Sequence, residues 1–138
     1  MDTVMPQNPK QIHGDKKPPL AQMPLVAMIA TSLAMMDGTN KYGFRNWREN
    51  PVEAMTYVNA ALRHLTLWAE GEEITRDTQV PNLGAVIACC AILLDAQVNG
   101  TLIDNREHSA PACDYLHDAE DVVRFLNVLQ NEREAAKA

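Results

Sequence analysis

The sequence of 138 residues has room for one domain that buries a core, and hardly for two. Twelve basic against 18 acidic residues give a formal net charge of -6, which argues against binding duplex nucleic acid through a basic face. The three cysteines are odd in number and lack C-x-x-C spacing, so they predict neither a disulfide framework nor a thiolate zinc site.

The N-terminal stretch and the apolar runs bear on where the protein works. Asp2, Pro6 and Pro9 stand where an export signal needs a basic start and a continuous apolar segment. The longest apolar run, residues 86–94, is far shorter than the roughly 18 residues of a membrane span. We therefore expect a cytoplasmic protein without a membrane partner.

A flexible arm and four helices are predicted in chain order. Residues 1–19 hold four prolines and few large apolar groups, a composition that does not offset the entropy cost of ordering. Capping residues and apolar spacing then predict four helices, over residues 25–37 ended by Gly38, 50–70 capped by Asn50, 83–98 ended by Gly100, and 119–136 capped by Asp118.

These segments, without alternating strand patterns or internal repeats, predict an all-α fold. We expect a compact bundle of four to five helices, with residues 20–138 forming a single domain. The segment 83–98 is apolar nearly all the way round, which implies that other helices or another subunit cover it.

The loop between the first two predicted helices combines cations, aromatic rings and an amide. Such groups suit nucleotide recognition, because Arg and Lys hold phosphate, an aromatic face stacks on a base, and Asn reads a base edge or a ribose hydroxyl. The alternative is an ordinary turn with its aromatic rings folded inward. The candidate nucleotide-binding residues of this loop are Lys41, Tyr42, Asn46, Trp47 and Arg48.

Two neighbouring residues on the second predicted helix, Arg63 and His64, are further candidates. Helical spacing places His64 beside Trp68. Arg63 is assigned to nucleotide binding and His64 to catalysis. A structural role is the alternative for His64, as for most lone histidines.

Carboxylates follow the second predicted helix and interrupt the third. Hard oxygen ligands bind Mg²⁺ or Mn²⁺ that neutralises a triphosphate. The alternatives are a solvated acidic loop and, for Asp95, a side chain that faces water. The predicted metal ligands are Glu72, Glu73, Asp77 and Asp95, with Glu72 and Asp77 also assigned to catalysis. Arg106, in the turn after Gly100, is a further candidate for nucleotide binding or for a local ion pair.

The order and spacing of these residues resemble the phage and prophage dATP/dGTP diphosphohydrolase family. The resemblance covers residues 19–106 and rests on the patterns D-G-x-x-K-Y-G-x-x-N-W-R and Y-x-x-A-x-R-H-x-x-x-W-x-x-G-E. The matching residues are Asp37, Gly38, Lys41, Tyr42, Gly43, Asn46, Trp47, Arg48, Tyr57, Ala60, Arg63, His64, Trp68, Gly71, Glu72, Asp77, Leu83, Gly84, Asp95, Gly100, Leu102, Asp104 and Arg106.

The resemblance implies an oligomeric, all-α MazG-like fold in which acidic side chains hold Mg²⁺ or Mn²⁺. Water would cleave a purine deoxynucleoside triphosphate to monophosphate and pyrophosphate. The sequence departs from the family pattern D-S-G-x-H-H-L-G-H at residues 77–85, where Pro81, Asn82 and Ala85 replace the histidines. Ala85 neither binds metal nor moves a proton. The alternative is therefore a homo-oligomer that sequesters a purine nucleotide or a nucleotide-derived signal of host antiviral defence without cutting it.

Overall fold

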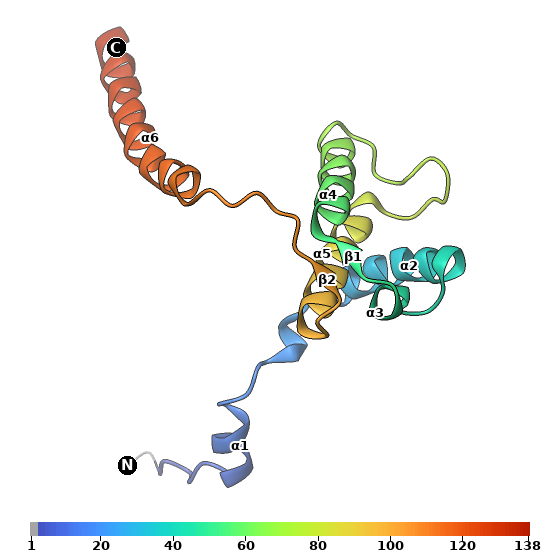
Figure 1. The fold of residues 1–138 in the computed structure, drawn as a ribbon. Coiled ribbons are helices and arrows are strands. Elements are labelled where there is room, and N and C mark those ends of the chain that lie inside the picture. Colours follow the sequence, from blue (N-terminus) through green and yellow to red (C-terminus); the bar gives the residue numbers. More distant parts are fainter. Residues whose placement is uncertain (1–2) are drawn as a thin grey trace. The chain divides into compact units, whose positions relative to one another are not determined.

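The computed structural model describes residues 3–138 and is dominated by helices (Figure 1). The all-α fold class is confirmed. In chain order the elements are α1 (Pro9–Gly14), a 3-10 helix η1 (Leu20–Gln22), α2 (Leu25–Tyr42), α3 (Asn46–Glu49), β1 (Val52–Glu53), α4 (Ala54–Ala69), α5 (Asn82–Val98), β2 (Leu102–Ile103) and α6 (Ala110–Lys137).

The chain divides into two compact units, one ending at Asn105 and one beginning at Arg106. The first contains α1 to β2 and the second contains α6. Within the predicted arm, residues 9–14 form a helix that the side chain of Asn8 caps by accepting the Lys10 N–H at 2.8 Å. The flexibility of the arm and the single domain over residues 20–138 stay predictions. No helix among residues 3–138 combines the length and the hydropathy needed to cross a bilayer.

Helix α5 is the centre of the first unit and packs against both α2 and α4. Its contact with α2 is close because residue 84 is glycine: a Cβ atom there would lie 2.3 Å from the carbonyl oxygen of Ala30. Ala88, Cys89 and Ala96 are buried along the same helix. The expectation that other helices cover 83–98 is thus confirmed for its small residues, while Leu94 and Val98 are exposed.

The predicted end of the first helix at Asp37 is wrong, because α2 continues to Tyr42. An ion pair of 2.9 Å between Asp37 and Lys41, one turn apart, supports the additional turn. The helix ends at Gly43, which has a φ of 98° and donates its N–H to Thr39 O at 2.9 Å. Glycine adopts this backbone conformation without the strain that a Cβ would cause.

The predicted start of the second helix at Asn50 is also wrong. Residues 52–53 are extended and pair in parallel with 102–103, in the register Val52 to Leu102 and Glu53 to Ile103. Helix α4 begins only at Ala54, and its N-terminus is capped from a distance by Asn105, whose Oδ1 accepts the Met55 N–H at 2.9 Å. The two-residue strands therefore bring a capping side chain to this helix.

The last helix begins nine residues earlier than predicted, at Ala110 rather than Ala119. The Oγ atom of Ser109 accepts the Ala112 N–H at 3.2 Å, which is the hydrogen bond of an N-cap, and Pro111 fits the first turn. Asp118, the predicted cap, lies inside the helix. The predicted third helix is confirmed within one residue, since α5 begins at Asn82 and Gly100 follows its end with a φ of 72°.

Candidate functional site

A cavity of about 300 Å³ lies among α2, α3, α4, α5 and the segment between α4 and α5. The elements that surround it hold both polar and aromatic side chains toward one space. Its polar and aromatic lining consists of Asp37, Lys41, Tyr42, Asn46, Trp47, Tyr57, His64, Thr75, Asp77 and Thr78. Ala85, Ala88 and Cys89 of α5 form part of its wall.

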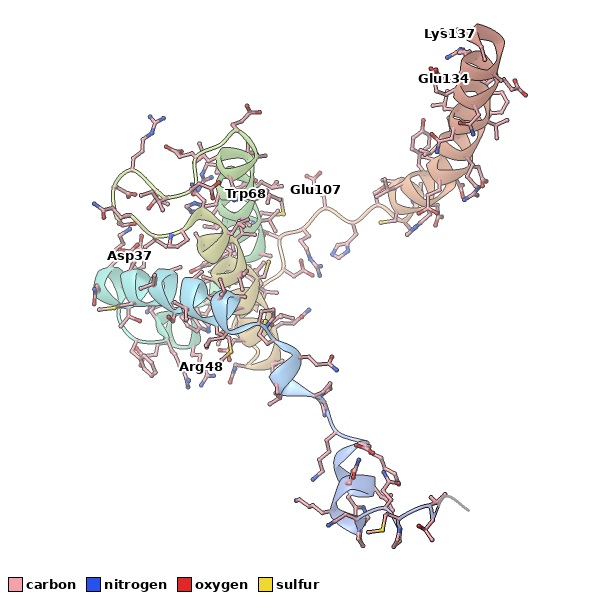
Figure 2. The ribbon with its side chains drawn as sticks, turned by 180° about the vertical axis from the view of Figure 1, so that it is seen from behind. Asp37, Arg48, Trp68, Glu107, Glu134 and Lys137 are labelled. Carbon is pink, nitrogen blue, oxygen red and sulfur yellow. The ribbon has the colours of Figure 1, made fainter. Side chains whose placement is uncertain are left out.

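Helix α2 contributes the cationic group of the cavity. The Lys41 Nζ atom lies 2.9 Å from Asp37 Oδ2, and Asp37 is labelled in Figure 2. The hydrogen bond that Lys41 donates to Asp37 raises the pKa of Lys41; burial lowers this pKa in part, and the charges of Asp37, Asp77 and Tyr42 raise it further. The ammonium group therefore stays protonated at neutral pH. Because two carboxylates accompany it, the fixed charge of the lining is -1 with His64 neutral.

His64 on α4 lines the cavity and is held by Asn82. Its Nδ1 atom lies 2.8 Å from Asn82 Oδ1, while Asn82 Nδ2 donates to the carbonyl oxygen of Glu72 at 2.8 Å. Since Oδ1 only accepts, Nδ1 carries the proton, and the neutral form of the ring therefore has its lone pair on Nε2. Asn82 is fully buried, and its backbone N–H donates to Glu73 O at 2.9 Å. The residue at position 82 thus fixes both the tautomer of His64 and the loop before α5.

Two tyrosines add aromatic surface to the cavity. Tyr42 is exposed and lines the opening from α2, whereas Tyr57 of α4 is half-buried. Burial raises the pKa of Tyr57, and the nearby Cys89 and Tyr42 raise it further. Burial likewise raises the pKa of Cys89. Both groups are therefore neutral at physiological pH and offer polar atoms rather than charges.

Trp47, Arg48 and Asp95 form a clamp between α3 and α5. Arg48 Nε and its terminal nitrogen donate to Asp95 Oδ2 and Oδ1 at 2.8 and 2.7 Å, and Trp47 Nε1 donates to Oδ2 at 2.7 Å. The Arg48 hydrogen bond, with that of Trp47, holds the pKa of Asp95 well below its usual range. The indole of Trp47 is buried with one face on the cavity, whereas Arg48 is directed to Asp95.

The four predicted metal ligands have separate neighbours in the structure. Glu72 pairs with Arg76, Glu73 accepts a hydrogen bond from Trp68 Nε1 at 3.2 Å, and Asp95 belongs to the clamp. Only Asp77 lines the cavity. Across residues 3–138, no three His, Cys, Asp or Glu side chains converge on a point where a metal ion would fit. A metal site formed by these four residues together stays a prediction. The contacts that their side chains make do not support it.

The predicted nucleotide-binding residues are divided between the cavity and other places. Lys41, Tyr42, Asn46 and Trp47 line the cavity. Arg63 lines a separate depression with Asn59 and Thr66 on α4. Arg106 opens the second unit, so its assignment stays a prediction.

Sequence reasoning did not assign roles to several residues that line or support the cavity. Asp37, Tyr57, Thr75 and Thr78 line it. Asp37 and Tyr57 belong to the family pattern quoted above, and this pattern is the feature of the sequence that could have indicated a role for them. Asn82 was considered only as a replacement for a histidine, and no spacing rule connects it with His64.

The fold and this cavity define the class of the protein as all-α, with a polar, aromatic-lined binding site enclosed between helices. The chain belongs to the dATP/dGTP diphosphohydrolase family, because the model of that family's N-terminal region matches residues 7–106. The match ends at the boundary of the first unit, so α6 lies outside it. Comparisons with curated proteins and with solved structures gave no match.

Proposed function

We propose that the cavity binds a purine deoxynucleoside triphosphate together with its divalent cation, and that the protein hydrolyses it to the monophosphate and pyrophosphate. The observation that carries this proposal is the cavity lining: one lysine, two carboxylates, exposed aromatic surface and a histidine of fixed tautomer face one space. Membership of the dATP/dGTP diphosphohydrolase family supports the substrate class.

The charge of the lining favours a cation-bound triphosphate over a bare one. Asp37 and Asp77 outnumber Lys41, so a bare polyanion would be repelled. Mg²⁺ is commonly held by one or two carboxylates together with substrate phosphates, rather than by a cage made only of protein groups. Mg²⁺ or Mn²⁺ would accordingly enter as part of the substrate and screen the phosphates from Asp37 and Asp77, while Lys41 holds a phosphate oxygen.

The base would lie on the aromatic side of the cavity. The exposed ring of Tyr42 offers a face for stacking, and the side-chain amide of Asn46 offers one donor and one acceptor group to a base edge. Trp47 is buried and bonded to Asp95, so its indole forms a fixed wall rather than a mobile lid.

His64 is suited to act as the general base. Its Nδ1 proton is directed to Asn82, which leaves the Nε2 lone pair to accept a proton from water. The water oxygen would form a bond to the α-phosphorus as the bond to the α–β bridging oxygen breaks. Pyrophosphate would leave with that electron pair, and the proton on Nε2 would return to solvent.

The test is chromatography of the full chain incubated separately with each deoxynucleoside triphosphate and Mg²⁺ or Mn²⁺. We expect monophosphate and pyrophosphate from the purine substrates. His64→Gln should lower kcat by roughly 10²–10⁴-fold with little change in KM. The matched control is His117→Gln, at an exposed histidine of α6, which should leave the rate unchanged.

Two outcomes would contradict parts of this proposal. Formation of nucleoside and triphosphate, or of diphosphate and inorganic phosphate, would exclude cleavage of the bond between the α-phosphorus and the α–β bridging oxygen. A purine nucleotide that is retained by the protein and released intact on denaturation would instead support sequestration, and then His64→Gln would change retention rather than rate.

A homo-oligomer, expected from the sequence, remains part of the proposal. The apolar residues exposed on α2 and α4 support it, among them Leu25, Val26, Ile29, Leu62 and Leu65. Sedimentation of the full chain would show its mass.

A further inference from the structure

Helix α6 exposes a long apolar surface. The side chains of Tyr115 and Leu116 are 80% and 72% exposed, and those of Val122, Val123 and Leu126 are more than half exposed. Along the whole helix only Ala119 and Leu129 are partly buried. Within the second unit, residues 106–138, no other helix or strand covers the apolar surface of α6. Helix α6 lies beyond residues 7–106, the part of the chain that the family model matches.

The apolar residues of α6 follow the spacing of a coiled-coil seam. Steps of three and four residues alternate along one side of the helix, giving a period of 3.5, which is the pattern that packs against a second helix in a left-handed supercoil. The seam consists of Ala112, Tyr115, Ala119, Val122, Leu126, Leu129, Arg133 and Ala136. Leu116 and Val123 extend it on one side.

The charge along α6 is self-complementary. The first half carries Asp114, Asp118, Glu120 and Asp121 without any Lys or Arg. The second half carries three basic and two acidic residues, namely Arg124, Arg133, Lys137, Glu132 and Glu134. Glu134 and Lys137, which lie 3.9 Å apart at their charged atoms, are labelled near the end of the helix in Figure 2. Two copies in opposite directions would place each acidic half against the half that carries Arg124, Arg133 and Lys137.

The sizes of the seam residues also favour an antiparallel pair. In an antiparallel pair whose two-fold axis passes residue 124 of both helices, Ala119 lies opposite Leu129 of the partner subunit. Val122 then lies opposite Leu126 of the partner subunit. The small Ala119 then faces the large Leu129, which suits close packing near the centre of the pair. A parallel pair in register would instead oppose Ala119 to itself and place two Arg133 guanidinium groups together in the seam.

Arg133, the only charged residue of the seam, has suitable neighbours in the antiparallel arrangement alone. It would face Tyr115 of the partner subunit, whose ring attracts a guanidinium group over its face. Asp118 lies one helical turn from Tyr115 and would pair with the same guanidinium.

We propose that α6 is an association helix that pairs antiparallel with α6 of a second copy of this chain. The pairing is independent of the cavity and of the proposed hydrolysis. It predicts an isologous contact in which Ala119 of each copy meets Leu129 of the other, so the same contact occurs twice, once on each side of the two-fold axis.

Disulfide trapping in the full chain tests the direction of pairing. The background is Cys90→Ser with Cys113→Ser, which removes the two exposed thiols and leaves the buried Cys89. Ala119→Cys and Leu129→Cys are made as separate variants with tags of different mass, mixed under reducing conditions and then oxidised. A disulfide forms only when the two Cα atoms lie within about 7 Å.

We expect the mixed 119–129 disulfide to exceed both homodimers at least tenfold. Asp121→Cys, on the outer side of the helix, is the matched control and should not cross-link. Homodimers of Ala119→Cys would show a parallel pair and overturn the proposal, and so would the absence of any cross-link.

Sedimentation tests whether the pairing determines the mass of the protein in solution. Leu126→Glu puts a carboxylate in the centre of the seam and should lower the mass about twofold. Val128→Glu, at an equally exposed residue outside the seam, should leave the mass unchanged. Equal masses for both variants and the wild type would overturn the proposal, because they would mean that α6 packs elsewhere or not at all.

Discussion

The side chain of Asn82 accepts the Nδ1 proton of His64 at 2.8 Å and donates to the carbonyl oxygen of Glu72 at the same distance. This fully buried amide therefore joins α4, α5 and the loop between them. It is a structural reason for a polar residue at the start of an otherwise apolar helix. It also makes the tautomer of His64 dependent on a residue 18 positions away.

Asn82→Ala should destabilise the protein and release the His64 tautomer. The carbonyl oxygen of Glu72 would lose its donor, and an unsatisfied buried group costs about 1–3 kcal/mol in the free energy of unfolding. Chemical denaturation measures that loss, and ¹⁵N chemical shifts of the imidazole report the tautomer. Asn99→Ala, which removes an exposed amide bonded to Asp95 O, is the control and should change both quantities little. An unchanged imidazole spectrum in Asn82→Ala would contradict the assigned hydrogen bond.

The Trp47, Arg48 and Asp95 clamp predicts a specific dependence of stability on pH. Because the pKa of Asp95 is lowered in the folded state, its contribution to stability is present above the ordinary aspartate pKa of about 3.9. That contribution decreases as the pH falls through the lower, folded-state pKa. Asp95→Asn should therefore be less stable than the wild type at neutral pH, with the difference in Tm shrinking on acidification below pH about 4.

Thermal melts across this pH range also separate the clamp from a metal site at Asp95. If Asp95 only clamps α3 to α5, added Mn²⁺ shifts the Tm of the wild type and of Asp95→Asn equally. A Tm that increases with Mn²⁺ in the wild type but not in Asp95→Asn would instead support the metal role predicted from the sequence. Glu107→Gln, at an exposed carboxylate between β2 and α6, is the control for the pH series.

Helices α2 and α5 approach each other so closely at Gly84 that a side chain at this position would overlap the backbone of α2. In Gly84→Ala the new Cβ would meet the Ala30 carbonyl oxygen at 2.3 Å, so the helices must separate. We expect a loss of about 1–3 kcal/mol in the free energy of unfolding, as for other overpacked cores. Gly38→Ala, inside α2 with no atom within 4 Å, should instead gain about 0.5–1 kcal/mol. A neutral Gly84→Ala would disprove this contact.

Much of the fold was predictable because apolar spacing over ten or more residues specifies a helix on its own. This is why α5 was predicted within one residue. The errors arose where a boundary depends on a partner that is distant in sequence. Gly38 and Gly43 are equivalent as sequence signals for a helix end, but the helix passes the first and ends at the second, where φ is 98°.

The candidate site was predictable in part for the same reason. Lys41, Tyr42 and Asn46 lie within six positions of one another in the sequence, and their chemistry alone indicates a nucleotide; in the structure they line the same cavity from α2 and α3. The pairing of Arg48 with Asp95 spans 47 positions, and no local pattern predicts it. Residues that appeared free to bind phosphate or metal are therefore used to hold helices together.

Asn50 and Asn105 are the two candidates for the N-cap of α4, one indicated by its neighbours in the sequence and the other distant in sequence. The sequence indicates Asn50 as the cap of the second helix, but the structure gives this role to Asn105. Asn105→Ala should lower the free energy of unfolding by about 1 kcal/mol, the usual cost of a lost N-cap. Asn50→Ala should change it by less than about 0.5 kcal/mol, as expected for a surface residue outside such a feature. Urea denaturation of both variants measures the difference, and amide hydrogen exchange at Met55 should accelerate only in Asn105→Ala. If Asn50→Ala were the more damaging change, α4 would begin where the sequence indicated, and the pairing of 52–53 with 102–103 would not persist in solution.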